Sequence, residues 1–483
     1  MRLISAVSGV QFPEPPLLTY LHLILNFFFS YIILTDIVYF SIKLYGGFMK
    51  TYTKWVLFTF FAALAAFILS PSFERLLTST SYQGFRINIM YLSGTIGIIL
   101  MSAAVIVSAR ISFINNMLGG LDKAYNFHKL SAGLGFLFGF IHYLISFTNK
   151  MLIKAGIFES SNSTNHLTGI ILEIYKASYI FLEPAFIIMI IVFFIAAYRK
   201  IPYRIFQLTH KLIPVLYLFT AFHAFATIFR GGWVGTIGGV ILHVFVIFGA
   251  VCAVITILQL TGIKHRYKGT VRNIKSIQNG IIEIQIETDN KLEYKAGQFV
   301  FLKFKFSFET HPFSIASYSN DNILTFYIKE CGDYTNKLME NLKNGEHVRI
   351  EGPYGQFTFD DENSSQLWIA GGIGITPFIA ALEYMSLNKN NKNITLILSS
   401  AGKSPFEEKL HTLCSKSNVK LITVDTDKEG MLSYNKIKQL APDIISSSIW
   451  FCGPYRFRIN VEKGLKADNI SIKNIYYDSF TFR

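Results

Sequence analysis

Four of the eleven histidines stand in two matched pairs inside long apolar stretches. His128 and His142 are fourteen residues apart, and His210 and His223 are thirteen apart. Fourteen residues of α-helix rise about 21 Å and make nearly four turns, so the first pair should lie on one side of a helix, near its two ends. Thirteen residues would turn the second pair away from each other, but Pro214 can kink or re-phase that helix and bring both rings back.

Imidazole is a good ligand for iron, and one histidine from each of two helices can hold a haem from both faces. Iron held in this way has no open position, so such a haem transfers electrons and does no other chemistry. A single histidine in an apolar helix can equally be a packing residue, although ionisable residues inside a membrane tend to be functional. Two matched pairs therefore predict two stacked haem sites. His22, His166 and His243 lack such partners and are predicted to be structural.

The elements that position these pairs are expected to be membrane-spanning helices. Hydrophobic residues make up 51% of the 483 residues, which exceeds what a soluble protein of this size carries, and they crowd into the first 262 positions. A run of about 20 apolar residues can cross a bilayer. The first run has no small-residue cleavage site and is too long for a signal-peptide core, so we expect a retained extra helix. Seven candidate runs occur, at 17–42, 55–70, 88–108, 128–148, 175–197, 209–228 and 235–260.

The formal charge of +14 comes from basic residues in loops that flank the predicted spans, and no nucleic-acid motif accompanies them. Basic loops stay on the cytoplasmic side of a membrane, so the pattern predicts that everything after residue 262 is cytoplasmic. Four cysteines lack a CxxC or any metal-ligand spacing, which argues against a disulfide framework, a zinc site or an iron–sulfur site. They are Cys252, Cys331, Cys414 and Cys452.

Beyond Lys275 the sequence alternates apolar and polar residues, which predicts half-buried strands and a small β-barrel. The run 311–317 offers an aromatic face and hydroxyl groups, which suit a flavin ring, while the glycine turn 332–335 suits a pyrophosphate. The chemistry-bearing residues of these two segments are His311, Pro312, Phe313, Ser314, Gly332 and Thr335.

From residue 367 the pattern changes to strands alternating with helices. An apolar strand runs into a glycine turn and then a helix, which leaves backbone N–H groups free to face an anion, although the turn is not the GxGxxG fingerprint. A later strand ends in a Cys-Gly-Pro turn, whose cysteine could also be a buried small hydrophobe. The residues of the two turns are Gly371, Gly372, Gly374, Thr376, Pro377, Cys452, Gly453 and Pro454.

Taken together and in this order, these segments resemble the ferric reductase and NADPH oxidase superfamily, in which a ferric reductase-like transmembrane domain precedes a ferredoxin reductase-type FAD and NAD(P) module. The resemblance implies that His128 and His210 hold one b-type haem and that His142 and His223 hold the other. It implies that Phe313 and Ser314 flank the flavin ring, that Gly332 and Thr335 take its phosphates, and that Cys452 lies beside the nicotinamide. It also implies a terminal aromatic residue, Phe480 or Phe482, stacked on the flavin.

The fold class implied is a multi-domain membrane protein: a helical haem bundle of six core helices plus one N-terminal helix, an antiparallel flavin-binding β-barrel, and an α/β nucleotide-binding domain. The expected domains are residues 1–46, 47–262, 263–360 and 361–483.

The function implied is electron transfer from cytosolic NAD(P)H through FAD and two b-type haems to an acceptor outside the plasma (cytoplasmic) membrane. We expect the lipid bilayer and a small-molecule acceptor, a ferric chelate or O2, as partners, and no nucleic acid. A superoxide-forming NADPH oxidase is an alternative, although that branch usually carries another histidine where this chain has Ser146. A haem subunit without a nucleotide half, and a non-enzymatic membrane channel or scaffold, are further alternatives.

Nucleotide choice rests on the turn after the second strand of the last domain. NADPH users in the family often place an arginine there, and the aligned residue in this chain is Gly402. Lys403 supplies charge without the bidentate fork of arginine, so we expect weak discrimination between NADPH and NADH.

Overall fold

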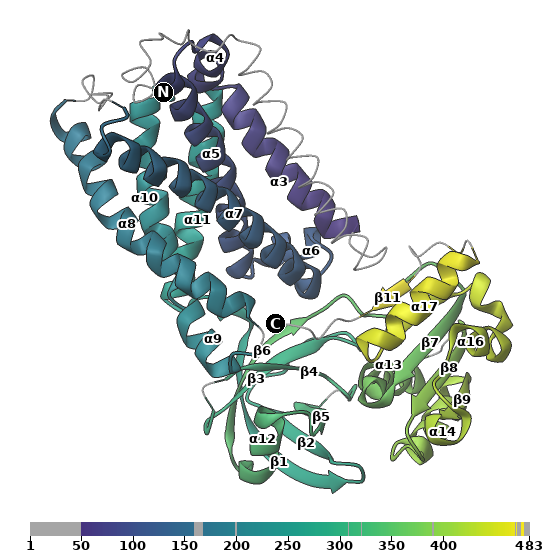
Figure 1. Ribbon diagram of the computed structural model, residues 1–483. Coiled ribbons are helices and arrows are strands. Elements are labelled where there is room, and N and C mark those ends of the chain that lie inside the picture. The colour runs from purple at the N-terminus through teal and green to yellow at the C-terminus, as the bar shows by residue number, and fades with distance from the viewer. Residues whose placement is uncertain are drawn as a thin grey trace. The chain divides into compact units, whose positions relative to one another are not determined.

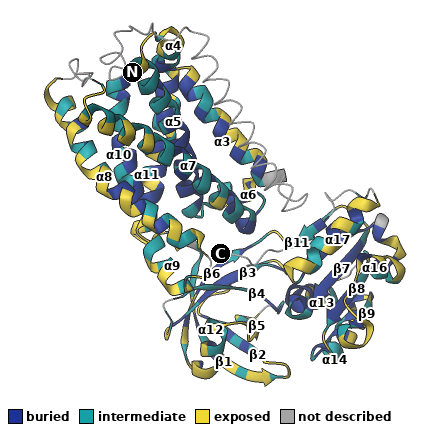
Figure 2. Cartoon of the chain, viewed as in Figure 1, coloured by how far each residue is buried: buried dark blue, intermediate teal, exposed yellow. Residues whose placement is uncertain are grey.

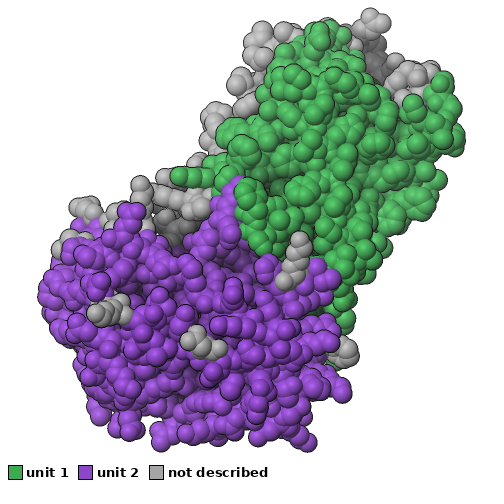
Figure 3. Space-filling view, turned by 180° about the vertical axis from the view of Figure 1, so that it is seen from behind, with its two compact units in different colours: residues 1–45, 49–114, 124–261 green, residues 46–48, 115–123, 262–483 purple. Residues whose placement is uncertain are grey.

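The computed structural model describes residues 50–158, 168–198, 200–307, 309–319, 321–388, 391–468, 470 and 475–477 (Figure 1). The predicted N-terminal helix, His22, His166, Phe480 and Phe482 lie outside the described residues. The chain forms two compact units (Figure 3). Of the described residues, those within 50–114 and 124–261 form the first unit, and those within 115–123 and from 262 onward form the second.

The first unit consists of long apolar helices. Among the described residues, five helices are long and apolar enough to cross a membrane, and a sixth span results if α3 and α4, bent by 69°, are one span. These helices match the six predicted runs that the structure describes. They are α3 (Lys50–Ile68) with α4 (Pro71–Thr78), α5 (Tyr82–Ser108), α7 (Leu121–Lys154), α8 (Gly169–Ala197), α9 (Tyr203–His210) with α10 (Ile213–Gly231), and α11 (Ile237–Ile257); the short α6 is Ser112–Met117.

Helix α5 is central to this unit. In its most apolar window 67% of residues are buried, against 22% in α7 and in α8 (Figure 2). Large apolar residues such as Ile180 and Ile191 are exposed along α8, as expected for a surface that faces lipid. A Cβ atom on Gly135 of α7 would lie 2.7 Å from Met101 Cγ of α5, so this glycine lets the two helices approach closely.

The helix that carries the second histidine pair breaks where the sequence predicts it. Helix α9 ends at His210, and α10 begins at Ile213 with Pro214 in its first turn. Proline lacks an N–H and fits a first helical turn, so the break costs little there. The interruption removes the continuous helical phase that would otherwise turn His210 and His223 apart.

The second unit begins with a six-stranded antiparallel sheet in the order β4-β3-β6-β1-β2-β5. Past the end of β4, Ala316 N donates a 2.8 Å hydrogen bond to Thr325 O of β5, which links the two edges of the sheet. Alternate residues of β2, including Ile284 and Ile286, fill its core. The strands are β1 (Arg266–Ile277), β2 (Ile281–Thr288), β3 (Phe299–Phe304), β4 (His311–Ser314), β5 (Ile323–Lys329) and β6 (His347–Tyr354), with α12 (Asp333–Asn341) after β5.

A five-stranded parallel sheet follows, in the order β11-β10-β7-β8-β9. Its strands are apolar on both faces because helices cover both: Trp368 and Trp450 pack toward α13 and α14, and Ile369 and Phe451 pack toward α16 and α17. The elements are β7 (Ser365–Gly371), α13 (Thr376–Leu387), β8 (Asn393–Ser400), α14 (Glu407–Ser417), β9 (Val419–Asp425), α15 (Thr426–Glu429), α16 (Tyr434–Leu440), β10 (Ser448–Cys452), α17 (Tyr455–Ala467) and β11 (Ile475–Tyr477), with 3-10 turns η1 (Ile263–His265), η2 (Gly372–Ile375) and η3 (Pro442–Ile445).

Candidate functional site

The structure brings the four predicted histidines together in two pairs. The ring centroids of His128 on α7 and His210 on α9 are 6.1 Å apart, with 74° between the ring planes. Those of His142 on α7 and His223 on α10 are 6.3 Å apart, with 71° between the planes. The two pairs therefore repeat one geometry at two levels of α7. From the predicted topology we name His128 and His210 the inner pair, and His142 and His223 the outer pair.

This separation fits two imidazoles that share one iron. A metal–imidazole nitrogen bond measures about 2.0–2.1 Å and the ring centre lies about 1.1 Å further, so ring centres on opposite sides of one metal are about 6.3 Å apart. Among the described residues no group of three or more His, Cys, Asp or Glu side chains could hold a metal ion. Haem needs only two protein ligands because its own ring supplies the rest, so the four histidines fit two haems.

Backbone carbonyls fix two of the four rings through hydrogen bonds to Nδ1. Nδ1 of His128 lies 2.9 Å from Ala104 O, and Nδ1 of His142 lies 2.9 Å from Met90 O. A carbonyl only accepts, so each Nδ1 carries the proton and each Nε2 keeps its lone pair for a metal. A Cβ atom on Gly94 of α5 would lie 2.9 Å from His142 Nδ1, so this glycine makes room for the ring.

The remaining two rings differ. The Ser178 hydroxyl donates to Tyr175 O over 2.7 Å and lies 3.3 Å from His223 Nδ1, so it is placed to accept from that nitrogen. His210 Nδ1 is buried and has no hydrogen-bond partner among the described residues, while its ring packs against Phe206 with centroids 5.0 Å apart.

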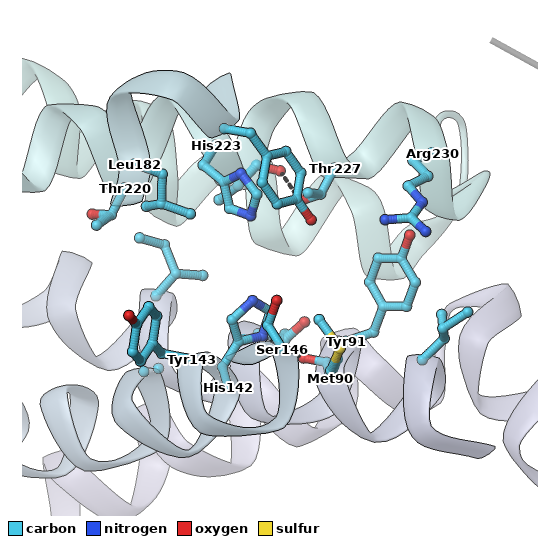
Figure 4. Close-up of a pocket in the computed structure, with 18 of the residues that line it drawn as sticks. Met90, Tyr91, His142, Tyr143, Ser146, Leu182, Thr220, His223, Thr227 and Arg230 are labelled. Atoms are coloured by element: carbon cyan, nitrogen blue, oxygen red, sulfur yellow. Dashed lines mark hydrogen bonds between the residues drawn. The ribbon is translucent and has the colours of Figure 1, made fainter. Parts of the chain in front are cut away.

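A cavity of about 280 Å³ surrounds the outer pair, between α5, α7, α8 and α10 (Figure 4). Ser146, Arg86 and Arg230 line it together with both histidines of the pair. The sequence analysis did not single out Arg230. It follows His223 by seven residues, two helical turns on the same face, and this spacing could have identified it.

The predicted flavin segment forms β4, the edge strand paired with β3. Pro312 and Phe313 are partly buried and Ser314 is buried. His311 Nε2 lies 2.8 Å from Glu309 Oε2, and its ring stacks on Tyr334 with centroids 3.7 Å apart. Burial lowers the pKa of His311 below its usual value, although Glu309 opposes the shift.

The predicted pyrophosphate turn lies at the start of α12. Gly332 has φ of 114°, a conformation that favours glycine. The Thr335 hydroxyl donates to Gly332 O over 3.0 Å and accepts from Cys331 N over 2.7 Å. The turn is therefore held by its own hydroxyl at the N-terminus of a helix, where backbone N–H groups favour an anion.

The two nucleotide turns lie against each other at the carboxyl ends of neighbouring strands. In the β7–β10 pairing Ala370 is opposite Cys452. A Cβ atom on Gly374 would collide with Cys452 O, and one on Gly371 would lie 2.7 Å from Pro454 Cδ. Cys452 is buried between them. Ligands of parallel α/β sheets bind outside these strand ends, and the glycines let the two turns pack together there. Gly372 belongs to η2, and Thr376 and Pro377 begin α13, as the motif predicts. Gly453 follows β10 directly.

Two carboxylates that the sequence analysis missed lie beside the turn after β8. Gly402 has φ of 66°, and its N–H donates to Asp425 Oδ1 over 3.0 Å. A Cβ atom on Gly402 would lie 3.7 Å from Asp427 Oδ2, while Lys403 is exposed. Asp425 stands at the end of β9, a strand adjacent to β8 only in the folded sheet. The sequence separation hides this contact.

One polar cluster joins the flavin sheet to the nucleotide domain. Glu383 of α13 accepts a 2.9 Å hydrogen bond from Tyr318 N, just after the flavin segment, and lies 3.0 Å from Lys409 Nζ of α14. Lys409 donates to the Tyr327 hydroxyl of β5 over 3.1 Å. Burial alone would lower the pKa of Lys409, but Tyr327 and Glu383 raise it above its usual value.

Two family models match this chain. Residues 93–221 match "ferric reductase like transmembrane component", and residues 266–358 match "FAD-binding domain". The first match includes His128, His142 and His210 and ends two residues before His223. The second covers the six-stranded sheet.

Curated relatives match different parts of the chain. Ferric reduction oxidase 8 of Arabidopsis thaliana is 37% identical over 24% of this chain and 18% of its own length. Dual oxidase 1 of Sus scrofa is 24% identical over 59% of this chain and 19% of its own length. Flavohemoprotein A of Dictyostelium discoideum is 28% identical over 31% of this chain and 39% of its own length. Each match thus spans well under two thirds of the relative.

The family matches and the apolar helices together identify an integral membrane protein with an FAD-binding half. The predicted resemblance to the ferric reductase and NADPH oxidase superfamily is thus confirmed in both halves of the chain.

Proposed function

We propose that this chain takes electrons from NAD(P)H at its flavin and nucleotide half and delivers them across the membrane to a ferric chelate. The observation that carries the proposal is the repeated histidine geometry, with ring centroids 6.1 Å and 6.3 Å apart at two levels of α7. Two levels about 21 Å apart along a helix cover most of a hydrocarbon layer about 30 Å thick.

The inner and outer pairs would each hold one b-type haem through Nε2. A haem bound there supplies a one-electron carrier inside the hydrocarbon. The protein's part is to present the lone pairs: Ala104 O and Met90 O fix the tautomers of His128 and His142. Gly94 leaves space for the second of these rings.

The second unit would hold the soluble cofactors. Phe313 and Ser314 of β4 would flank the flavin ring, and the turn with Gly332 and Thr335 would take the pyrophosphate. FAD bound there supplies the exchange between a two-electron hydride and single electrons. The glycine turn before α13 and the turn with Cys452 would receive the nicotinamide nucleotide, with Phe480 or Phe482 as the stacking residue. The basic flanking loops support a cytoplasmic location for this unit in the plasma (cytoplasmic) membrane.

Reduction of oxygen to superoxide is the second candidate, and the similarity to dual oxidase 1 favours it. Ser146 lines the outer cavity at the position where the oxidase branch usually has a histidine. A hydroxyl in place of that imidazole favours the ferric chelate.

Purified protein tests the proposal through its absorbance spectrum and its consumption of NADH and NADPH. We expect two haems for each FAD, and oxidation of nucleotide that accelerates when a ferric chelate is added without oxygen. Rapid aerobic oxidation with stoichiometric superoxide, and no acceleration by the chelate, would favour the oxidase. A spectrum with neither haem nor flavin bands would contradict both and favour a membrane channel or scaffold.

A further inference from the structure

A buried serine lies beside one histidine of the outer pair. The side chain of Ser178 on α8 is fully buried, and its Oγ lies 3.3 Å from Nδ1 of His223 on α10. The same hydroxyl donates its only proton to Tyr175 O, three residues earlier in α8, over 2.7 Å. Its lone pairs remain for His223, so this imidazole donates from Nδ1 and keeps the lone pair of Nε2 for a metal.

The other histidine of the outer pair has a carbonyl in the same place. Nδ1 of His142 lies 2.9 Å from Met90 O, and the Ser93 hydroxyl donates to that same oxygen over 3.1 Å. Each Nδ1 of the outer pair therefore has an acceptor. Figure 4 shows the two rings directed toward each other across the cavity, as two ligands of one iron must be.

The inner pair differs at the corresponding atom. Nδ1 of His128 lies 2.9 Å from Ala104 O, but Nδ1 of His210 is buried and has no hydrogen-bond partner among the described residues. The His210 ring instead stacks on Phe206, with centroids 5.0 Å apart. A phenyl ring restrains the imidazole by contact and takes no proton from it. The two pairs thus share one ring separation but differ in what holds the second ring.

An acceptor at Nδ1 changes an imidazole ligand in two ways. It fixes the tautomer and the direction of the ring, and it makes Nε2 more basic because it draws the Nδ1 proton away. A more basic ligand stabilises ferric iron relative to ferrous iron, which lowers the midpoint potential of a haem. Loss of such a partner typically weakens metal binding by about tenfold to a hundredfold.

We infer that Ser178 is a positioning residue for His223, whose hydroxyl lowers the midpoint potential of the outer haem and tightens its binding. The inference rests on the proposed function, because it needs a haem at the outer pair. Removal of the hydroxyl should leave His223 in the condition of His210, a buried ring with no acceptor at Nδ1.

The test compares Ser178→Ala with Ser108→Ala in full-length protein. Ser108 is the matched control: its hydroxyl also donates to the carbonyl three residues earlier, Val105 O, over 2.7 Å, and has no histidine partner among the described residues. We would measure the midpoint potentials of both haems by optical redox titration, and the rate at which each haem transfers to apomyoglobin. His223→Ala, which should lack the outer haem, assigns the two signals.

Ser178→Ala should raise the midpoint potential of the outer haem and speed the loss of that haem by about tenfold to a hundredfold. The inner haem should keep its wild-type values. Ser178→Thr should restore both properties, because a threonine hydroxyl can also donate to the preceding turn and accept from the imidazole. Ser108→Ala should match the wild-type protein in both measurements.

The inference is overturned if Ser178→Ala matches Ser108→Ala, or if the inner haem changes as much as the outer one. It is also overturned if Ser178→Thr behaves as Ser178→Ala does, since the hydroxyl would then not be the cause. These results would leave the proposed function standing, because the wild-type protein would still hold two haems. Wild-type protein without haem would overturn the proposed function and the inference together.

Discussion

The two units position their chemistry by different means. In the membrane unit, single side chains carry the predicted ligands, and helix phase decides where they point: α7 presents His128 and His142 on one side, and the break before Pro214 brings His210 and His223 opposite them. In the second unit, the predicted contacts come mainly from backbone turns, where Gly374 and Gly371 keep adjacent loops close.

This difference teaches what each unit tolerates. A side-chain ligand is lost when that side chain is truncated. A closely packed glycine turn is instead disrupted when a side chain is added to it. Substitutions that test the two units should therefore act in opposite directions: removal of atoms in the membrane unit, and addition of atoms in the nucleotide domain.

The largest effect is expected from His142→Ala or His223→Ala. Each should remove one haem and stop reduction of the outside acceptor, because that haem would lose one of its two histidine ligands, while His128→Ala or His210→Ala should remove the other haem. Haem content and absorbance after purification measure this. His243→Ala is the control, since its Nδ1 bonds to Gly239 O and the residue belongs to neither pair. Two equivalents of haem in all four variants would show that the pairing is wrong.

The corresponding addition is Gly374→Ala, whose Cβ would collide with Cys452 O. Overpacking of this kind costs about 1–3 kcal/mol, so we expect kcat/KM for NAD(P)H to fall by about tenfold to a hundredfold, with haem and FAD retained. The exposed Ala401→Val in the same domain should leave kcat/KM unchanged. If Gly374→Ala kept wild-type nucleotide kinetics, the close packing of Gly374 against Cys452 would not be needed for nucleotide binding.

A smaller effect is expected from the cluster that joins the flavin sheet to the nucleotide domain. Glu383→Gln or Lys409→Met should slow flavin reduction by about twofold to fivefold with little change in nucleotide affinity, because partly exposed pairs contribute about 0.2–1 kcal/mol. Stopped-flow reduction of the flavin at saturating nucleotide measures the rate. Lys295→Met, which breaks the exposed Lys295–Asp360 pair, is the control. Equal rates in all three variants would contradict a positioning role.

The smallest effect concerns nucleotide choice. The carboxylates of Asp425 and Asp427 beside Gly402 would repel a 2′-phosphate, while Lys403 would attract it. We expect the ratio of kcat/KM for NADPH over NADH to be near or below one, to rise several-fold in Asp425→Asn and to fall in Lys403→Ala. A wild-type ratio well above a hundred would refute this interpretation. A ratio that neither substitution changes would show that Asp425 and Lys403 do not influence nucleotide choice.

The sequence predicted the described spans, the helix break beside Pro214 and the turns that are assigned to flavin and nucleotide, because these depend on local periodicity and on residue types at fixed spacing. It missed Asp425, Glu383 and Lys409. Their contacts exist only because β9 pairs with β8 and because α13 and α14 face the flavin sheet. Charge pairs formed by tertiary packing leave no period in the sequence. The stacking role of Phe480 or Phe482 stays a prediction.

The central claim is that electrons cross the membrane through this chain. Proteoliposomes with ferric citrate trapped inside and NADH supplied only outside test it most directly, using protein molecules whose nucleotide domain faces outward. The account predicts reduction of the trapped iron in wild-type vesicles and none with His223→Ala, while NADH-dependent reduction of the flavin persists in both. Reduction of the trapped iron at the wild-type rate by His223→Ala, or its absence in wild-type vesicles that contain haem and FAD, would contradict the account.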